Sequence, residues 1–191
     1  MKYRPRGFTL IEIVVGIVVL AVSLTIVTSV FLPQANKMTS PMYQIKATAL
    51  GKSIMNQVLI RYYDELNVSS GSFSPCTTCS SGLGPDKRTL PAVSESRGNP
   101  SAFNDVDDYN AYCDVGGEGT YDPQLARQQL IDNSDNRYNG YGIRICVTLA
   151  ADNFAPSIPV NTSNNVAKRI ELTVFMPNNE EITFTSFKGN Y

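Results

Sequence analysis

Residues that usually carry enzyme chemistry are sparse in this sequence, and this is the first constraint on function. There is no histidine among the 191 residues, which excludes Ser-His-Asp and Cys-His catalysis and histidine-ligated metals. Carboxylates are scattered over polar segments without a recognisable nucleophile–base pair. We therefore expect a protein that is not an enzyme and that needs no cofactor.

The four cysteines could form disulfides or bind zinc. A C-x-x-C pair is followed by two widely separated single cysteines, so the second C-x-x-C of a zinc ribbon is missing. In an oxidising compartment an even number indicates two disulfides, for which three connectivities exist. A four-thiolate zinc site and a redox dithiol are the alternatives. We favour a local disulfide between Cys76 and Cys79, called the Cys76–Cys79 clip below, and a second disulfide between Cys113 and Cys146.

Two tight acidic clusters occur, at residues 104–109 and 132–136. Hard oxygen ligands at such density could hold calcium. Neither cluster fits an EF-hand loop, since Arg137 replaces the required glycine in the second cluster and Ile143 replaces its last glutamate. We expect solvated loops with Asx turns. The alternative is a calcium site formed by Asp105, Asp107 and Asp108.

The N-terminal segment combines a short basic leader with a long apolar run. No charged residue occurs from Ile13 to Leu32, and a helix over this run is about as long as the ~30 Å hydrocarbon core of a bilayer. We expect it to span the membrane. Leader cations stay on the cytoplasmic side, so the C-terminal bulk should lie outside. These cations are Lys2, Arg4 and Arg6.

Glu12 is the unusual residue at the start of the apolar run. A carboxylate within a membrane helix costs about 2.5–3.5 kcal/mol on insertion scales, so it needs a reason. Two other interpretations of the segment are a secretory signal peptide cut after Ser23 and an ordinary single-span anchor. Neither accounts for Gly7 and Phe8 followed by Glu12.

The string Gly7-Phe8-Thr9-Leu10-Ile11-Glu12 closely resembles the class III signal of type IV prepilins. This resemblance implies cleavage after Gly7 by a membrane aspartyl peptidase, the prepilin peptidase, and methylation of the new amine of Phe8. It also implies that Glu12 pairs with the terminal amine of a neighbouring subunit. An ammonium opposite a buried carboxylate in low dielectric offsets much of the cost of burial.

A wider resemblance is to the minor pilins of the mannose-sensitive haemagglutinin (MSHA) pilus. It implies a low-abundance structural subunit in the bacterial inner membrane, with a periplasmic head, that later enters an extracellular fibre. Implied partners are the assembly platform, the major pilin and other minor pilins. Alternatives are a type II secretion pseudopilin and a tip adhesin or ligand-binding subunit. The segments concerned are Ile13 to Leu32, Pro33-Gln34-Ala35, residues 47–64, residues 76–79 and residues 103–110.

Nucleic acid is not an expected partner. Loss of the leader leaves 13 of the 16 basic side chains against 17 acidic ones, a net charge of −4. A nucleic-acid binder needs a basic face to neutralise phosphates.

The elements expected to position these residues make an α+β, pilin-like fold. Leader 1–7 precedes a transmembrane helix at 8–32 and an amphipathic continuation at 33–66, with bends or a melted stretch at Pro33 and Pro41. One helical face, running to about Leu66, should pack on a sheet. Its members are Ala47, Leu50, Ile54, Val58 and Tyr62.

The head, residues 67–191, should be loop-rich over 67–140 and form an antiparallel sheet over 141–191. Three segments alternate apolar and polar residues, which predicts strands with one buried face. A turn at Pro177, Asn178 and Asn179 separates the last two. The predicted strands are residues 142–149, 168–176 and 181–187.

Overall fold

The computed structural model describes residues 7–70, 75–76, 79, 82–85, 95–113, 121–131, 136–154 and 166–191, with the backbone alone for 32–39, 68–70 and 152. The rest of the predicted leader, 1–6, lies outside these residues. The chain divides into two compact units, Met1–Met42 and Tyr43–Tyr191. Each unit is described by itself.

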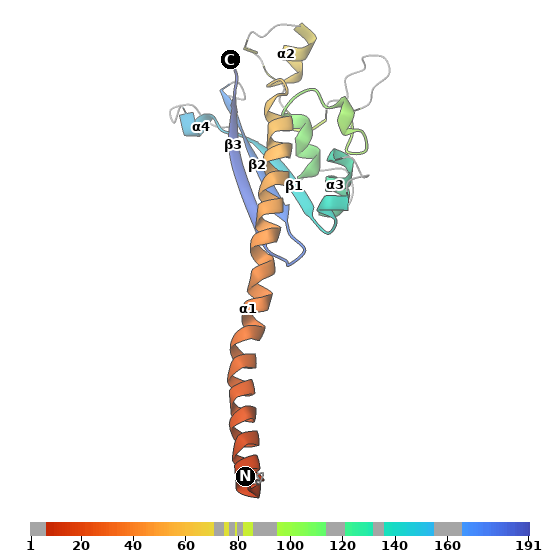
Figure 1. Ribbon diagram of the computed structural model, residues 1–191. Coiled ribbons are helices and arrows are strands. Elements are labelled where there is room, and N and C mark those ends of the chain that lie inside the picture. Colours follow the sequence, from red (N-terminus) through yellow and green to blue (C-terminus); the bar gives the residue numbers. More distant parts are fainter. Residues whose placement is uncertain are drawn as a thin grey trace, which may run out of the picture. The chain divides into compact units, whose positions relative to one another are not determined.

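Helix α1, Leu10–Leu59, runs from the first unit into the second (Figure 1). Its backbone is helical through Pro33 and Pro41, so the melted stretch expected at these prolines is absent from α1. Each proline removes one helical hydrogen bond, and the turns on either side keep theirs. Of the two alternatives expected at these prolines, a bend or a melted stretch, the melted stretch was therefore wrong.

The part of α1 within the second unit carries the predicted buried face. Ala47, Leu50, Ile54 and Val58 are at most 1% exposed. Tyr62 was expected on this face but is 38% exposed, because the helix ends at Leu59 rather than near Leu66. Beyond it the backbone pairs with another segment: Tyr62 N–H donates to the Asn104 carbonyl, and Val106 N–H donates to the Tyr62 carbonyl.

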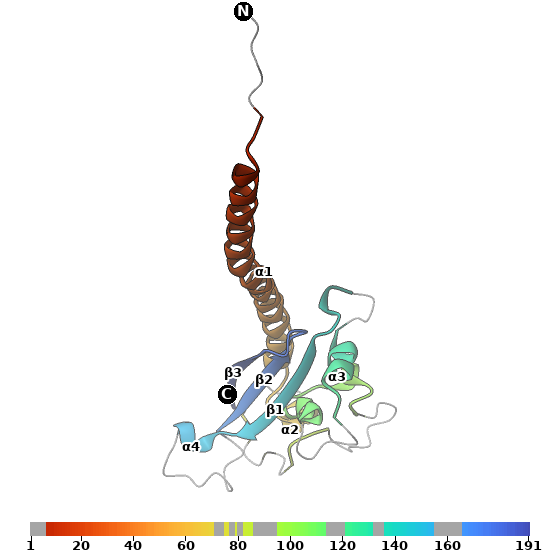
Figure 2. The ribbon, with the colours of Figure 1, turned by 90° about the horizontal axis from the view of Figure 1, so that it is seen from below.

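The sheet has three antiparallel strands in the order β1-β2-β3, as Figure 2 shows. Their bounds are Gly142–Leu149, Ala167–Phe175 and Glu181–Gly189. Asn179 takes a positive φ of 63° in the β2–β3 turn, a conformation that asparagine tolerates well. The predicted fold class, a long N-terminal apolar helix followed by an α+β region with an antiparallel sheet, is confirmed.

The core of the second unit lies between this sheet and α1. Alternate residues of β1 and β2 supply it, among them Ile145, Ile170 and Leu172, all at most 1% exposed. Gly51 lets α1 approach β3 closely, because a side chain at this position would meet the ring of Phe184.

Short segments cover the rest of the core. Helix α3, Pro123–Leu130, packs on β1 and is capped by Asp122, which accepts hydrogen bonds from Gln124 and Leu125. The 3-10 helix η2, Asp107–Tyr112, also packs on β1. The other short helices are α2 at Glu65–Ser70, η1 at Pro100–Ala102, η3 at Asn136–Tyr138 and α4 at Ala151–Phe154.

Candidate functional site

The predicted processing junction lies at the exposed start of α1. Gly7 and Phe8 precede the helix in non-helical backbone, and Phe8 is 82% exposed. A side chain at position 7 would meet nothing within 4 Å. Among the residues that the structure describes, nothing therefore obstructs the bond between Gly7 and Phe8.

Thr9 and Glu12 form a capping box at the N-terminus of α1. Glu12 Oε2 accepts hydrogen bonds from Thr9 N–H at 3.2 Å and Thr9 Oγ1 at 3.1 Å, and Glu12 N–H donates to Thr9 Oγ1 at 3.4 Å. The pattern Thr-x-x-Glu is the sequence signature of this arrangement. Sequence reasoning missed the role of Thr9, although the spacing was readable. The carboxylate of Glu12 therefore already has donors within its own chain.

The helix that follows exposes its apolar side chains. Residues Leu10–Phe31 have a mean hydropathy of 2.8 and are, by length and composition, able to cross a membrane. Large apolar side chains from Phe8 to Phe31 are 48–82% exposed. An apolar surface of this extent needs lipid or other protein around it.

The predicted acidic cluster is buried rather than solvated. Asp105, Asp107 and Asp108 are each 1% exposed, so the expectation of a solvated loop was wrong. Asp105 Oδ1 accepts from the N–H groups of Asp107 and Asp108, and Asp108 Oδ2 accepts from those of Asn104 and Asp105. The bond from Asp107 N–H to Asp105 is the expected Asx turn. The second cluster lies largely outside the described residues, at 132–135.

A lysine supplies the positive charge that balances this cluster. Lys168 Nζ lies 2.5 Å from Asp107 Oδ1, 3.4 Å from Asp64 Oδ2 and 2.7 Å from the carbonyl oxygen of Tyr63. It also lies 4.6 Å from the centre of the Tyr63 ring. A calcium ion at Asp105, Asp107 and Asp108 would have to displace Lys168 from Asp107 and backbone N–H groups from the other two carboxyls.

Sequence analysis did not single out Lys168 as a site residue. Lys168 lies two residues before Ile170, so the period of two puts both side chains on the inward face of β2, and both residues are at most 1% exposed. Its carboxylate partners lie 61 and 104 residues away in the chain, which local pattern does not reveal.

Burial changes the protonation of this cluster. It raises the pKa of Asp105 to about 11, helped by the neighbouring carboxylates Asp107 and Asp108 and opposed by Lys168. Burial also raises the pKa of Asp108 to about 7, against the effect of the two backbone N–H donors. Asp105 is therefore neutral at pH 7 and can donate a hydrogen bond to the side chain of Asp107.

We predict a pH dependence of stability from these two carboxyls. Their ordinary pKa is 3.8, so between that pH and the raised pKa the folded chain binds more protons than the unfolded chain. The free energy of unfolding should then fall from about pH 4 to about pH 7 by up to ~1.4 kcal/mol per pH unit for each carboxyl. Above about pH 7 only Asp105 should still contribute.

Asp105→Asn should reduce the slope of the free energy of unfolding against pH by about the contribution of one carboxyl. The substitution should therefore stabilise the protein more at pH 8 than at pH 4. Asparagine keeps an oxygen for the two N–H donors and has no proton to lose. The measurement is chemical unfolding of the purified protein across this pH range. Asp122→Asn is the control, because an exposed helix cap tolerates asparagine. An unchanged slope in Asp105→Asn would contradict the assignment.

The four cysteines form two disulfides, Cys76–Cys79 and Cys113–Cys146. The second joins the end of η2 to β1. The first is held against the C-terminus, since Asn190 Oδ1 accepts from Cys76 N–H and Asn190 Nδ2 donates to the Cys76 carbonyl.

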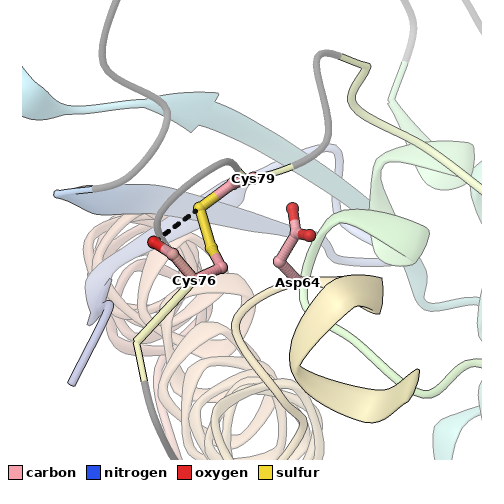
Figure 3. A group of neighbouring side chains, drawn as sticks. All are labelled: Asp64, Cys76 and Cys79. Atoms are coloured by element: carbon pink, nitrogen blue, oxygen red, sulfur yellow. Dashed lines mark hydrogen bonds between the residues drawn. A yellow bond between two sulfur atoms is a disulfide. The ribbon is translucent and has the colours of Figure 1, made fainter. Parts of the chain in front are cut away.

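Asp64 faces the Cys76–Cys79 disulfide, as Figure 3 shows, and the ligand atoms of the three residues lie within 4.8 Å of one another. Metal-binding cysteine is a thiolate, and these sulfurs are bonded to each other instead. The dashed 3.5 Å approach of Cys79 Sγ to the Cys76 carbonyl is a contact, because a disulfide sulfur has no hydrogen to donate. In this oxidised form the group is not a zinc site.

A polar pocket of about 390 Å³ opens beside the end of α1. Arg61 supplies its positive charge, and its Nε donates to the Tyr109 hydroxyl at 3.4 Å. The remaining polar lining consists mainly of amides and a hydroxyl. The lining residues are Gln57, Arg61, 98–101, Tyr109, Gln129 and Leu130.

Comparison with known proteins bears on the N-terminal segment. A family model described as the prokaryotic N-terminal methylation motif matches residues 2–28. No curated protein and no solved structure matches the chain. The matched residues include the leader, the junction, Glu12 and most of the apolar run.

The chain is type IV pilin-like in its N-terminal segment, where the methylation motif opens an exposed apolar helix, and an α+β region follows this helix. Proteins of this class are structural rather than enzymatic. The class III signal implies processing by a prepilin peptidase and handling by pilus assembly machinery. Both the motif and the helix are consistent with residence in the inner membrane and then in a pilus.

Proposed function

We propose that the chain is a minor structural subunit of a type IV pilus and acts in assembly of the fibre. The observation that carries the proposal is the class III signal placed at the exposed start of an apolar helix. In this proposal the helix first anchors the subunit in lipid and then packs against other subunits in the fibre. Both environments would cover the apolar side chains that α1 leaves exposed.

Processing would occur between Gly7 and Phe8, followed by methylation of the Phe8 amine. Residues Ile13 to Leu32 would span the membrane, with the head on the periplasmic side. Two disulfides support this orientation, since disulfides persist in oxidising compartments.

Glu12 would serve in assembly through a change of partner. In the membrane, Thr9 donates to its carboxylate and lowers the cost of burial. In the fibre, the terminal amine of a neighbouring subunit would add a full positive charge, which is worth more in low dielectric than neutral donors. The subunit would then leave the membrane most readily for a site that offers this charge.

The finer assignment is to the D-type minor pilin of an MSHA pilus, MshD. It rests on the sequence resemblance in the membrane helix, its continuation, the Cys76–Cys79 clip and residues 103–110. Partners would be the prepilin peptidase, the assembly platform, the major pilin and other minor pilins.

Fractionation tests this function against a pseudopilin role. We expect the chain in fibres sheared from the cell surface, in small amounts relative to the major pilin, and few fibres when its gene is deleted. A chain confined to the cell envelope, whose deletion blocks protein secretion while fibre number is unchanged, would contradict the proposal and favour a type II secretion pseudopilin.

A ligand-binding role at the fibre tip is the second candidate, and the pocket beside Arg61 favours it. One guanidinium among amides and hydroxyls suits a small polar ligand that is neutral or carries one negative charge.

A further inference from the structure

Lys168 is a buried amine that the proposed assembly role does not use. Its side chain is 1% exposed and lies on β2, where it meets Asp107 of η2 and Asp64, which follows α1. The two carboxylates are 2% and 0% exposed. Three segments that are far apart in the chain therefore bring one amine and two carboxyls together in a buried site.

We propose that Lys168 and Asp107 become joined by an intramolecular isopeptide bond, with Asp64 as the group that transfers the proton. Lys168 Nζ is the nucleophile and the Asp107 carboxyl is the group attacked. Their closest approach is 2.5 Å, between Nζ and Oδ1. Asp64 Oδ2 lies 3.4 Å from the same nitrogen.

The reaction needs no oxidant and no second substrate. Within the buried pair, the ammonium first gives one proton to the Asp107 carboxylate, so that a neutral amine faces a neutral carboxylic acid. The amine nitrogen then attacks Cγ of Asp107. Asp64 takes a proton from the nitrogen and passes it to the departing oxygen, the C–O bond breaks, and one amide and one water molecule result.

Burial is the physical reason why this pair can react. The side chains of Lys168 and Asp107 are at most 2% exposed, so bulk water has almost no access to the reacting atoms. The ring of Tyr63, 4.6 Å from Nζ, closes one side of the site. Fixed proximity replaces an intermolecular encounter, an effect that can greatly accelerate such a step.

Asp105 would assist through its hydrogen bond to the side chain of Asp107. Burial raises the pKa of Asp105, so it remains a neutral carboxylic acid that hydrogen-bonds to the Asp107 side chain. A hydrogen-bond donor to the Asp107 carboxyl polarises the group that Lys168 attacks. It also stabilises the negative charge that develops on the carboxyl oxygen during the attack.

The bond would fasten η2 to β2, across 61 residues of chain. The disulfide Cys113–Cys146 already fastens the other end of η2 to β1. An amide does not depend on redox state, so the covering segment would stay attached under reducing conditions.

Peptide mapping of the full protein purified from membranes or fibres tests the proposal. The disulfide joins the same two tryptic peptides, 98–127 and the one that ends at Lys168, so the protein is reduced and alkylated before digestion. We expect these peptides to remain linked, with a mass lower by one water molecule and no cleavage after Lys168. Two separate peptides of full mass, with cleavage after Lys168, would overturn the proposal.

Three variants sharpen the test. Lys168→Arg keeps the buried charge and cannot form the amide, so the link should vanish. Asp64→Asn should abolish or strongly slow its formation, and normal linkage in this variant would overturn the role of Asp64. Lys188→Arg is the matched control, because Lys188 is a part-buried lysine that donates to the Leu59 carbonyl, and its replacement should leave the link complete.

Discussion

Glu12→Val is expected to yield a subunit that is inserted and processed but nearly absent from fibres. Valine suits the apolar helix, so insertion should be normal, but it leaves the neighbouring subunit's ammonium without its partner. Loss of one member of a buried ion pair costs about 3–5 kcal/mol, which corresponds to a fall in incorporation of ~100-fold or more. The measurement is the ratio of this chain in sheared fibres to that in membranes.

Thr9→Val is the matched control for Glu12. It removes the hydroxyl of the capping box but keeps the carboxylate and the Thr9 backbone donor. Loss of a helix cap costs only about 0.5–2 kcal/mol, so this variant should still enter fibres. Normal incorporation of Glu12→Val would refute charge pairing, and an equal defect in Thr9→Val would make Glu12 simply a helix cap.

Gly7→Leu should abolish processing, so that the chain keeps its leader and stays in the membrane. A side chain added at Gly7 would meet no described residue within 4 Å. The substitution should therefore leave the fold of this chain intact. The defect would arise in the peptidase, which must accept the backbone at the scissile bond. The N-terminal residue of the membrane-bound protein, determined by sequencing or mass, checks this.

Gly16→Leu provides the control for Gly7. Position 16 lies on α1 and is likewise free of neighbours within 4 Å, and leucine suits a membrane helix. We expect normal cleavage in this variant. Full processing of Gly7→Leu at the same junction would mean that the residue before Phe8 does not direct cleavage.

Local pattern was sufficient for the elements that position the signal. The apolar run predicted the first part of α1, and alternation predicted β1 over the same residues that the structure shows, Gly142–Leu149. Spacings of three and four predicted the buried face from Ala47 to Val58. These features depend on periodicity, which each segment carries in its own sequence.

Features that depend on distant partners were not predictable in the same way. Tyr62 fits the helical spacing, but α1 ends at Leu59, and the backbone of Tyr62 forms hydrogen bonds with Asn104 and Val106 instead. Asp105, Asp107 and Asp108 have the composition of a solvated loop, but backbone N–H donors and the approach of Lys168 to Asp107 make their burial tolerable.

The cleavage site between Gly7 and Phe8 stays a prediction from the sequence, which also held, in the Thr-x-x-Glu spacing, a signal for the capping partner of Glu12 that the sequence analysis missed. The six residues from Gly7 to Glu12 lie within the segment that the methylation motif matches. Thr9 is one of them, and the hydrogen bonds at the start of α1 show its capping role.

The N-terminal residue of the unmodified protein, isolated from membranes and from sheared fibres, is the most direct test of the central claim. We predict that the chain begins at Phe8 and that its amine carries a methyl group. A chain that still begins at Met1, or one that begins at Leu24 after removal of an ordinary signal peptide, would contradict the proposed role as a processed pilin-like subunit.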